Sequence, residues 1–443
     1  MVGYARRLGL FSGTMAVIGG IIGGGIFRTP ATVAERVGSP ALVLTTWITG
    51  GIIALIGALC FGELGQRRPK AGGGYVYLRE AWGPLPAFLY GWALLLVIAT
   101  GAIAAVAVTF ADYGLALAGL PARHAVPVAV GAIVLLSGVN WVGVRPGAVT
   151  QNVLTLLKLG ALTALIVVGL SAAVPVAGPP PPSSSPGGWP GAAASLGAAL
   201  VPVLFTYGGW QQTNFLAEEI VKPERNLPRA LVLGVAAVIA VYLLVNLAYL
   251  RVLGPAGLAT STAPAADAMR SLLGPTGGTL IAAGIAVSTL GFLDLVILVT
   301  PRVLQAMAAD GVFFPRLARL HPVYRTPTAA IALQGTWAIA LTLTGTFGQL
   351  VDYVAFADWI FFGLTVGGLF VYRARDRAQG VAGSGFRVPG YPWTPALFVA
   401  AALYVVLSSV LANLRNAAMG MALLGLGIPV YGYWRARSAR RPA

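Results

Sequence analysis

Long apolar segments separated by short polar connections follow one another along almost all of the 443 residues. A helix that crosses a bilayer needs about 20 predominantly apolar residues, and twelve segments meet that requirement. We expect them at 11–35, 41–64, 80–111, 124–144, 150–172, 196–218, 229–251, 274–301, 328–347, 350–372, 394–413 and 416–434. The pattern therefore predicts an all-α polytopic membrane protein with twelve transmembrane helices.

Glycine clusters interrupt two of these segments. The first segment contains Gly23, Gly24 and Gly25 in succession, and the sixth contains Gly208 and Gly209. Unwound backbone at bilayer depth is tolerated only where it is buried in protein or lines a cavity. Small residues also let helices pack closely, but three consecutive glycines exceed that need. A pair of interrupted helices, one in each half of the chain, indicates a transporter's substrate site.

A stretch rich in proline, glycine and serine, 178–192, divides the predicted helices into two sets. Five helices precede it and five follow it, and each set begins with an interrupted helix. Since five is odd, the second set enters the membrane with inverted topology, which permits a 5+5 inverted repeat. We expect the first repeat at 1–177, an extracellular loop at 178–192 and the second repeat at 193–373. The last two helices and a basic cytoplasmic tail occupy 374–443.

The composition supports this assignment and explains the positive charge. Apolar residues make up 57% of the chain, charged residues 9%, and the formal net charge is +16. If the N-terminus is cytoplasmic, 22 of the 29 Lys and Arg residues fall in cytoplasmic segments. This positive-inside bias predicts a cell membrane protein with both termini in the cytoplasm. The excess of basic residues therefore reflects orientation in the bilayer and does not indicate a nucleic-acid partner.

The interruptions predict how a zwitterion would bind. A broken helix ends in free N–H groups on one side and free C=O groups on the other, with partial charges to match. We expect an α-carboxylate on the amides of Gly23 to Gly25, and an α-ammonium on carbonyls around Ile22 and from Phe205 to Gly208. Phe205 is also a candidate gate, and Gln211 a candidate contact for the substrate side chain. The predicted substrate-binding residues are Ile22, Gly23, Gly24, Gly25, Phe205, Thr206, Tyr207, Gly208 and Gln211.

Lys158 is a charged residue inside the fifth predicted helix. An ammonium near the bilayer centre costs about 2.5 to 3.5 kcal/mol, so it normally faces a cavity and has a partner. One hypothesis is that its charge replaces a bound sodium ion and contacts first-helix carbonyls and hydroxyls such as Ser288 or Thr289. The other is that Lys158 gains and loses a proton. Asp294, in the eighth helix, is a further candidate that pairs with Arg302 or joins a proton path.

The other charged residues indicate neither catalysis nor a metal site. Glu63, Glu218 and Glu219 lie near cytoplasmic helix ends beside Arg67 and Lys222, where interfacial ion pairs are the favoured interpretation. The two histidines have no cysteine or carboxylate at metal-ligand spacing, and no nucleophile elbow or phosphate loop is present. We therefore expect no enzymatic activity, no metal and no cofactor.

Several motifs resemble those of a known transporter family. They are Ile-Ile-Gly-Gly-Gly-Ile-Phe at 21–27, Phe-Gly-Glu-Leu-Gly at 61–65 with the glycine-rich 69–84, the segment 205–228, and the aromatic segments 353–363 and 386–392. Together they cover nearly the whole chain and are similar to the amino acid-polyamine-organocation (APC) superfamily, in its L-type amino acid transporter-like branch.

The resemblance implies a 5+5 inverted-repeat fold, alternating access, α-amino acid substrates and a fifth-helix lysine, matched by Lys158, in place of sodium. A sodium-independent amino acid exchanger is the expected function. Because the branch includes both exchangers and proton-coupled carriers, a symporter in which Lys158 titrates is an alternative. A polyamine or amine carrier and a non-transporting amino acid sensor are further alternatives. Whether an accessory subunit binds stays open.

Overall fold

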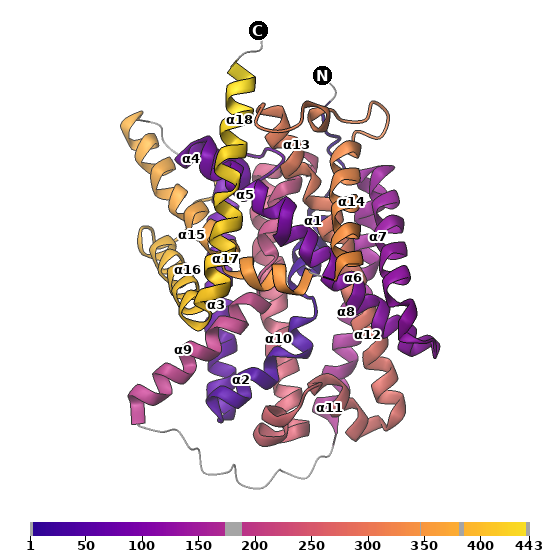
Figure 1. The fold of residues 1–443 in the computed structure, drawn as a ribbon. Helices are drawn as coiled ribbons and strands as arrows, with labels where there is room; N and C mark the ends of the chain where they lie inside the picture. The colour runs from indigo at the N-terminus through magenta and orange to yellow at the C-terminus, as the bar shows by residue number, and fades with distance from the viewer. Residues whose placement is uncertain (1–2, 173–187, 346, 381–384, 440–443) are drawn as a thin grey trace.

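The chain folds into an elongated helical bundle in which both termini lie at the same end (Figure 1). The computed structural model describes residues 3–172, 188–345, 347–380 and 385–439. Within these ranges, nine segments are long and apolar enough to cross a membrane. They are Pro40–Arg67, Pro84–Ala118, Ala122–Trp141, Val144–Ser171, Ala193–Glu219, Pro223–Thr260, Pro275–Ala309, Trp393–Ala412 and Leu414–Ser438. The prediction of a polytopic helical protein is confirmed for this part of the chain.

The other three predicted spans are helical but do not meet that criterion of length and apolar character within the described residues. The first is divided into α1 (Leu10–Ile21), a 3₁₀ turn (Gly25–Phe27) and α2 (Thr29–Val37). The ninth is α14 (Thr328–Thr344), and the tenth is α15 (Phe347–Ala378), which begins beside a residue that is not described. Most of the predicted loop 178–192 also lies outside the described residues. The count of twelve and the repeat boundaries therefore stay predictions.

Both predicted interruptions are present. α1 ends at Ile21, and only Ile22 separates it from the three glycines. α9 (Gly188–Thr206) ends at Thr206, and a 3₁₀ helix, η4 (Trp210–Glu219), starts after Gly209. Gly209 has φ 106°, in the region that favours glycine. Glycine therefore ends the regular helix at each site.

The two interruptions contact each other through their backbones. A Cβ atom built on Gly209 would lie 2.1 Å from the carbonyl oxygen of Gly20, and one built on Gly20 would lie 2.8 Å from the carbonyl oxygen of Gly209. Real Cβ atoms essentially never approach other atoms as closely as this. Glycine at these two positions is therefore required for the helices to meet.

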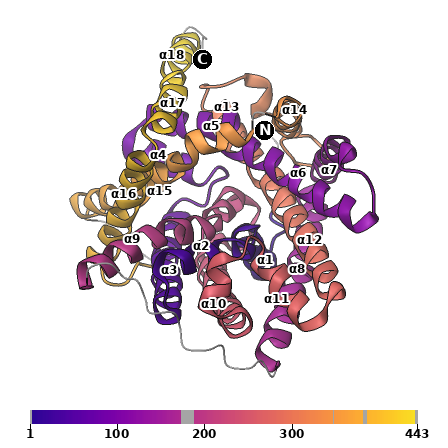
Figure 2. The ribbon, with the colours of Figure 1, turned by 60° about the horizontal axis from the view of Figure 1, so that its bottom comes forward.

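Longer helices surround this contact. α10 (Pro223–Thr260) packs on α1 and on α3 (Pro40–Arg67), while α12 (Pro275–Val299) packs on α6 (Ala99–Ala118) and α8 (Val144–Ser171). Figure 2 shows these helices arranged around α1. The remaining elements are α4 (Gly74–Trp82), α5 (Pro84–Ala93), η2 (Leu94–Ile98), η3 (Ala122–His124), α7 (Ala125–Trp141), α11 (Pro264–Leu273), α13 (Pro301–Ala309), η5 (Pro315–Ala318), α16 (Trp393–Ala412), α17 (Leu414–Gly425) and α18 (Gly427–Ala439).

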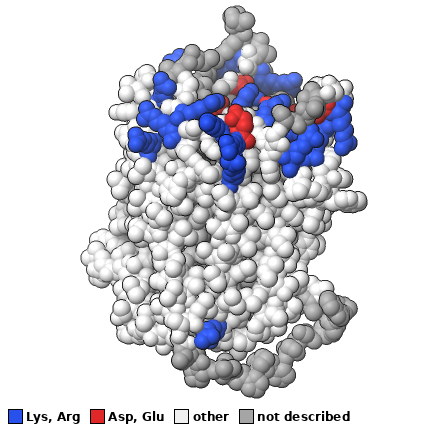
Figure 3. Space-filling model, turned by 180° about the vertical axis from the view of Figure 1, so that it is seen from behind, with Lys and Arg blue, Asp and Glu red and all other residues white. Residues whose placement is uncertain are grey.

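Charged side chains gather at the end of the bundle that carries the termini (Figure 3). On the face shown, the surface between the two ends is almost free of charge, as a lipid-facing surface requires. The charged end is the one that the positive-inside pattern assigns to the cytoplasm.

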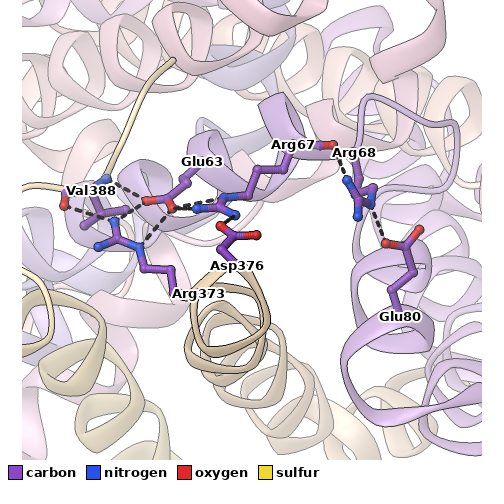
Figure 4. Close-up of polar contacts among 7 residues, drawn as sticks. All are labelled: Glu63, Arg67, Arg68, Glu80, Arg373, Asp376 and Val388. Atoms are coloured by element: carbon purple, nitrogen blue, oxygen red, sulfur yellow. Dashed lines mark hydrogen bonds and ion pairs between the residues drawn. The ribbon is translucent and has the colours of Figure 1, made fainter. Parts of the chain in front are cut away.

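At this end, an ion-pair network joins α3 to α15 (Figure 4). The buried Glu63 carboxylate accepts hydrogen bonds from Arg67 at 2.8 Å, from Arg373 at 2.6 Å and from the amide of Val388 at 2.7 Å. Arg67 also pairs with Asp376 at 2.5 Å. The predicted pairing of Glu63 with Arg67 is confirmed, and Arg373 is an additional partner.

We expect Glu63→Gln to destabilise the protein more than Glu80→Gln does. Removing one partner of a buried ion pair leaves the other charge uncompensated and costs about 3 to 5 kcal/mol. Glu80 pairs with Arg68, whose side chain is 45% exposed, and an exposed pair contributes about 0 to 1 kcal/mol. The measurement is the midpoint temperature at which the detergent-solubilised protein loses its monodisperse elution peak. Equal midpoints for the two variants would contradict the structural role of the network.

Two predicted ion pairs are wrong. Glu219 pairs with Arg302 at 2.9 Å, with both side chains buried, rather than with Lys222. The Arg302 guanidinium donates to the Glu219 carboxylate on η4 and also to the carbonyl of Leu298 on α12. The carboxylate of Asp294 accepts from Asn140 at 2.8 Å instead of pairing with Arg302.

Candidate functional site

A cavity of about 550 Å³ lies beside the two helix interruptions. Its lining residues come from the α1 break, from α5, η2 and α6, from α9 and η4, and from α12 and α15. Most of them are apolar or aromatic, with a few polar groups among them. This volume and lining are typical of a site for a small organic molecule.

The first interruption presents backbone amides to the cavity. Gly23, Gly24 and Gly25 all line it. The amide of Gly23 donates to the carbonyl of Ile21 at 2.9 Å, whereas within the described residues the amides of Gly24 and Gly25 have no backbone acceptor. A Cβ atom built on Gly24 would have nothing within 4 Å, so open space lies directly beside it. Two free amides next to open space are suited to hold an anion.

Lys158 occupies the carbonyl side of the same interruption. Its ammonium is fully buried and donates to the carbonyl of Ile22 at 2.8 Å and to that of Gly19 at 3.2 Å. These carbonyls belong to the C-terminal end of α1, where the helix dipole favours a cation. The structure thus brings Lys158 together with the first-helix carbonyls that the sequence analysis named.

Of the two predicted hydroxyl partners, Ser288 reaches α1 and Thr289 does not. The Ser288 hydroxyl donates to the carbonyls of Ile22 at 3.3 Å and Gly23 at 3.5 Å. Thr289 donates to carbonyls of its own helix at 2.9 Å, although it lines the cavity. Successive residues of an α-helix point about 100° apart, so the two hydroxyls face different neighbours.

The residues of the second interruption point in different directions. Phe205, Thr206 and Gly208 line the cavity, and the Phe205 ring lies edge-on to Trp359 with centroids 6.2 Å apart. The ring of Tyr207 is instead buried among aromatic residues outside the cavity lining. Phe205 therefore faces the cavity, whereas the Tyr207 ring packs against other aromatic residues.

Gln211 and Gln212 both line the cavity but differ in their hydrogen bonds. The side-chain oxygen of Gln211 accepts from the amide of Gly209 at 3.0 Å and so supports the turn. The side-chain oxygen of Gln212 has no hydrogen-bond partner among the described residues. The side-chain oxygen of Gln212, a residue that the sequence analysis did not name, is therefore still available to accept a hydrogen bond.

Asp294 lies on the same side of α12 as the residues that face Lys158. A Cβ atom on Gly291, about one turn before it, would be 3.1 Å from the Lys158 nitrogen, and the two charges interact electrostatically. One Asp294 oxygen accepts from Asn140, and the other has no partner in the part of the chain that the structure describes. This geometry keeps Asp294 as a candidate for a proton path.

Two cavity features were missed by the sequence analysis. The π-helix η2 (Leu94–Ile98) lines one wall, and π-helices often occur at functional sites. No glycine or proline within it marks it in the sequence. Asp358 lines the cavity from α15, and a lone acidic residue in an apolar span was a signal that could have found it.

Comparison with known proteins gives consistent matches over most of the chain. A family model described as amino acid permease matches residues 8–428. Human b(0,+)-type amino acid transporter 1 is 34% identical over 83% of this chain and 76% of its own length. The serine/threonine exchanger SteT of Bacillus subtilis is 32% identical over 99% and 98%, and human large neutral amino acids transporter small subunit 2 is 30% identical over 98% and 82%. All three relatives are named as transporters or exchangers of amino acids.

Proposed function

Since the chain belongs to the amino acid permease family, in the L-type branch of the APC superfamily, and is a multi-pass membrane transporter of amino acids, we propose that it is a sodium-independent exchanger of α-amino acids. It works by alternating access, with twelve transmembrane helices, a 5+5 inverted repeat and both termini in the cytoplasm.

The observation that carries the proposal is the pair of free amides at Gly24 and Gly25, which lie beside the cavity. In our proposal, the α-carboxylate of the substrate accepts hydrogen bonds from these amides. The C-terminal end of α9, at Phe205 and Thr206, lines the same cavity and supplies carbonyl groups for the α-ammonium. A zwitterion thus meets partial charges of the right sign at both of its ends.

Sodium independence rests on Lys158. Its ammonium binds the carbonyls of Gly19 and Ile22, and Ser288 adds a hydroxyl to the same group of oxygens. Carbonyl and hydroxyl oxygens are the ligands with which unwound transporter helices coordinate Na⁺. In this proposal, the lysine therefore supplies permanently the positive charge that a sodium ion would bring.

Exchange rather than net uptake is supported by the relatives, one of which is named as a serine/threonine exchanger. We expect the loaded carrier to change its orientation much faster than the empty one. The rings of Phe205 and Trp359 both line the cavity and contact each other edge-on. They are the proposed gate on one side of the substrate.

The test is uptake of radiolabelled amino acids into sodium-free proteoliposomes, with and without unlabelled amino acid inside. Uptake that needs internal amino acid and is unchanged by sodium is the expected result. Uptake into empty liposomes driven by an inward proton gradient would show that the protein is a proton symporter and not an exchanger. Uptake that requires sodium would overturn the role proposed for Lys158.

A further inference from the structure

The cavity contains one charged side chain among its described lining residues, that of Asp358. All other lining residues are glycines, apolar and aromatic residues, hydroxyl residues and the two glutamines. A carboxylate in such surroundings exposes its charge to a largely apolar space within the membrane. The few polar groups of such a cavity select its ligand, so the Asp358 carboxylate indicates which chemical group the ligand carries at this position.

Asp358, which is partly buried, differs from the fully buried carboxylates in having no partner among the described residues. Glu63 is paired with two arginines, Glu219 with Arg302, and Asp294 with Asn140. Among the described residues, Asp358 forms neither an ion pair nor a hydrogen bond, and part of its side chain remains accessible from the cavity. A charge that is removed from water is normally compensated by an opposite charge or by hydrogen bonds, and here the chain supplies neither.

Aromatic residues line the cavity together with Asp358. Trp359 and Phe362 follow it on α15, and Tyr90 of α5 lines the same cavity and is close enough to interact electrostatically with the carboxylate. The Tyr90 ring packs on Phe361 with centroids 5.1 Å apart, which fixes this wall. Aromatic faces attract cations and pack against methylene groups. The surroundings of Asp358 therefore suit an aliphatic stem that ends in a positive charge.

We propose that Asp358 is a specificity-determining residue that binds a cationic side chain, so that the transporter carries basic amino acids. The inference rests on the proposed function, because it needs the α-carboxylate and α-ammonium to be held at the interrupted helices. The side-chain ammonium or guanidinium then reaches Asp358 from inside the cavity. Binding completes a charge pair that the empty protein lacks.

The test compares lysine with norleucine, which has a similar side-chain stem but no terminal ammonium. Purified wild-type protein and the variants Asp358→Asn, Asp358→Glu and Asp112→Asn are reconstituted, and each amino acid competes for uptake of radiolabelled lysine or norleucine. Asp112 lies on α6 and is exposed outside the cavity lining, so it controls for loss of a carboxylate. The measured quantity is the ratio of the lysine affinity to the norleucine affinity.

We expect the wild type and Asp112→Asn to favour lysine by at least tenfold, Asp358→Glu to retain a preference for lysine, and Asp358→Asn to lose it. A wild-type ratio near one would overturn the inference, as would an Asp358→Asn ratio equal to that of the wild type. If norleucine binds the wild type well only at acidic pH, and Asp358→Asn removes this pH dependence, the inference is supported, because a proton then neutralises Asp358 in place of a cationic side chain. Failure of the wild type to bind any α-amino acid would instead contradict the proposed function.

Discussion

Transport falls to background, in our expectation, when Lys158 is replaced by alanine. The ammonium makes charge-assisted hydrogen bonds to the carbonyls of Gly19 and Ile22 in a fully buried position. Each such bond contributes about 1.5 to 3 kcal/mol, so losing one shifts a conformational equilibrium about ten- to hundredfold. The C-terminal end of α1 would then lack the cation that holds its carbonyls in the binding geometry.

The measurement is the initial rate of amino acid exchange in proteoliposomes that contain equal amounts of folded protein. Lys70→Ala is the matched control, because Lys70 is exposed and lies outside the cavity lining. The control should exchange at the wild-type rate. Normal kinetics in Lys158→Ala would refute both proposed roles of this lysine, as a fixed charge and as a proton carrier.

Replacing Gly24 by valine should abolish substrate binding while leaving the fold intact. Gly24 has φ −74°, which any residue adopts, and a Cβ atom there meets open space. The valine methyl groups would therefore occupy the part of the cavity beside the free amides of Gly24 and Gly25. Loss of two hydrogen bonds to a carboxylate, each about 1.5 to 3 kcal/mol, predicts a loss of affinity of roughly a hundredfold or more.

Gly160→Val is the control for Gly24→Val. Gly160 lies on the exposed face of α8, and a Cβ atom there also has nothing within 4 Å. Both variants should show the wild-type unfolding temperature in detergent, and only Gly24→Val should lose the stabilisation that a bound amino acid gives. If Gly24→Val still binds substrate with wild-type affinity, the carboxylate does not dock on these amides.

The helix interruptions could be predicted from the sequence because their cause is local. Three consecutive glycines in the first span and two in the sixth end the helices at Ile21 and Thr206. The approach of Lys158 to α1 could also be predicted, since a buried ammonium requires oxygen partners and the broken helix offers them. Both inferences depend on residues within a single segment, and these can be identified in the sequence without knowledge of the packing.

The direction in which a side chain points could not be predicted in the same way. Ser288 and Thr289 are neighbours with equivalent hydroxyls, and only the rotation of α12 decides which one reaches α1. Tyr207 follows Phe205 by two residues but is buried away from the cavity. Such outcomes depend on how several helices pack together, and an apolar helix without a polar stripe contains little information about its own rotation.

Partners far apart in the chain were the least predictable. Arg302 was expected beside Asp294, eight residues earlier, but the nearer acceptor in space is Glu219, which is 83 positions away in the chain. The same holds for Glu63, which binds Arg373 as well as its neighbour Arg67. Sequence spacing favours partners on one helix, whereas the bundle brings together helix ends from both halves of the chain.

The backbone contact between Gly20 and Gly209 limits how the broken helices can move. Two surfaces that meet through side chains can slide, because rotamers rearrange as they pass. Here backbone meets backbone with no side chain between them. No rotamer change can therefore relieve the clash that a small sliding movement would cause. During a transport cycle we therefore expect α1 and α9 either to rotate together as one rigid body about this contact or to separate completely.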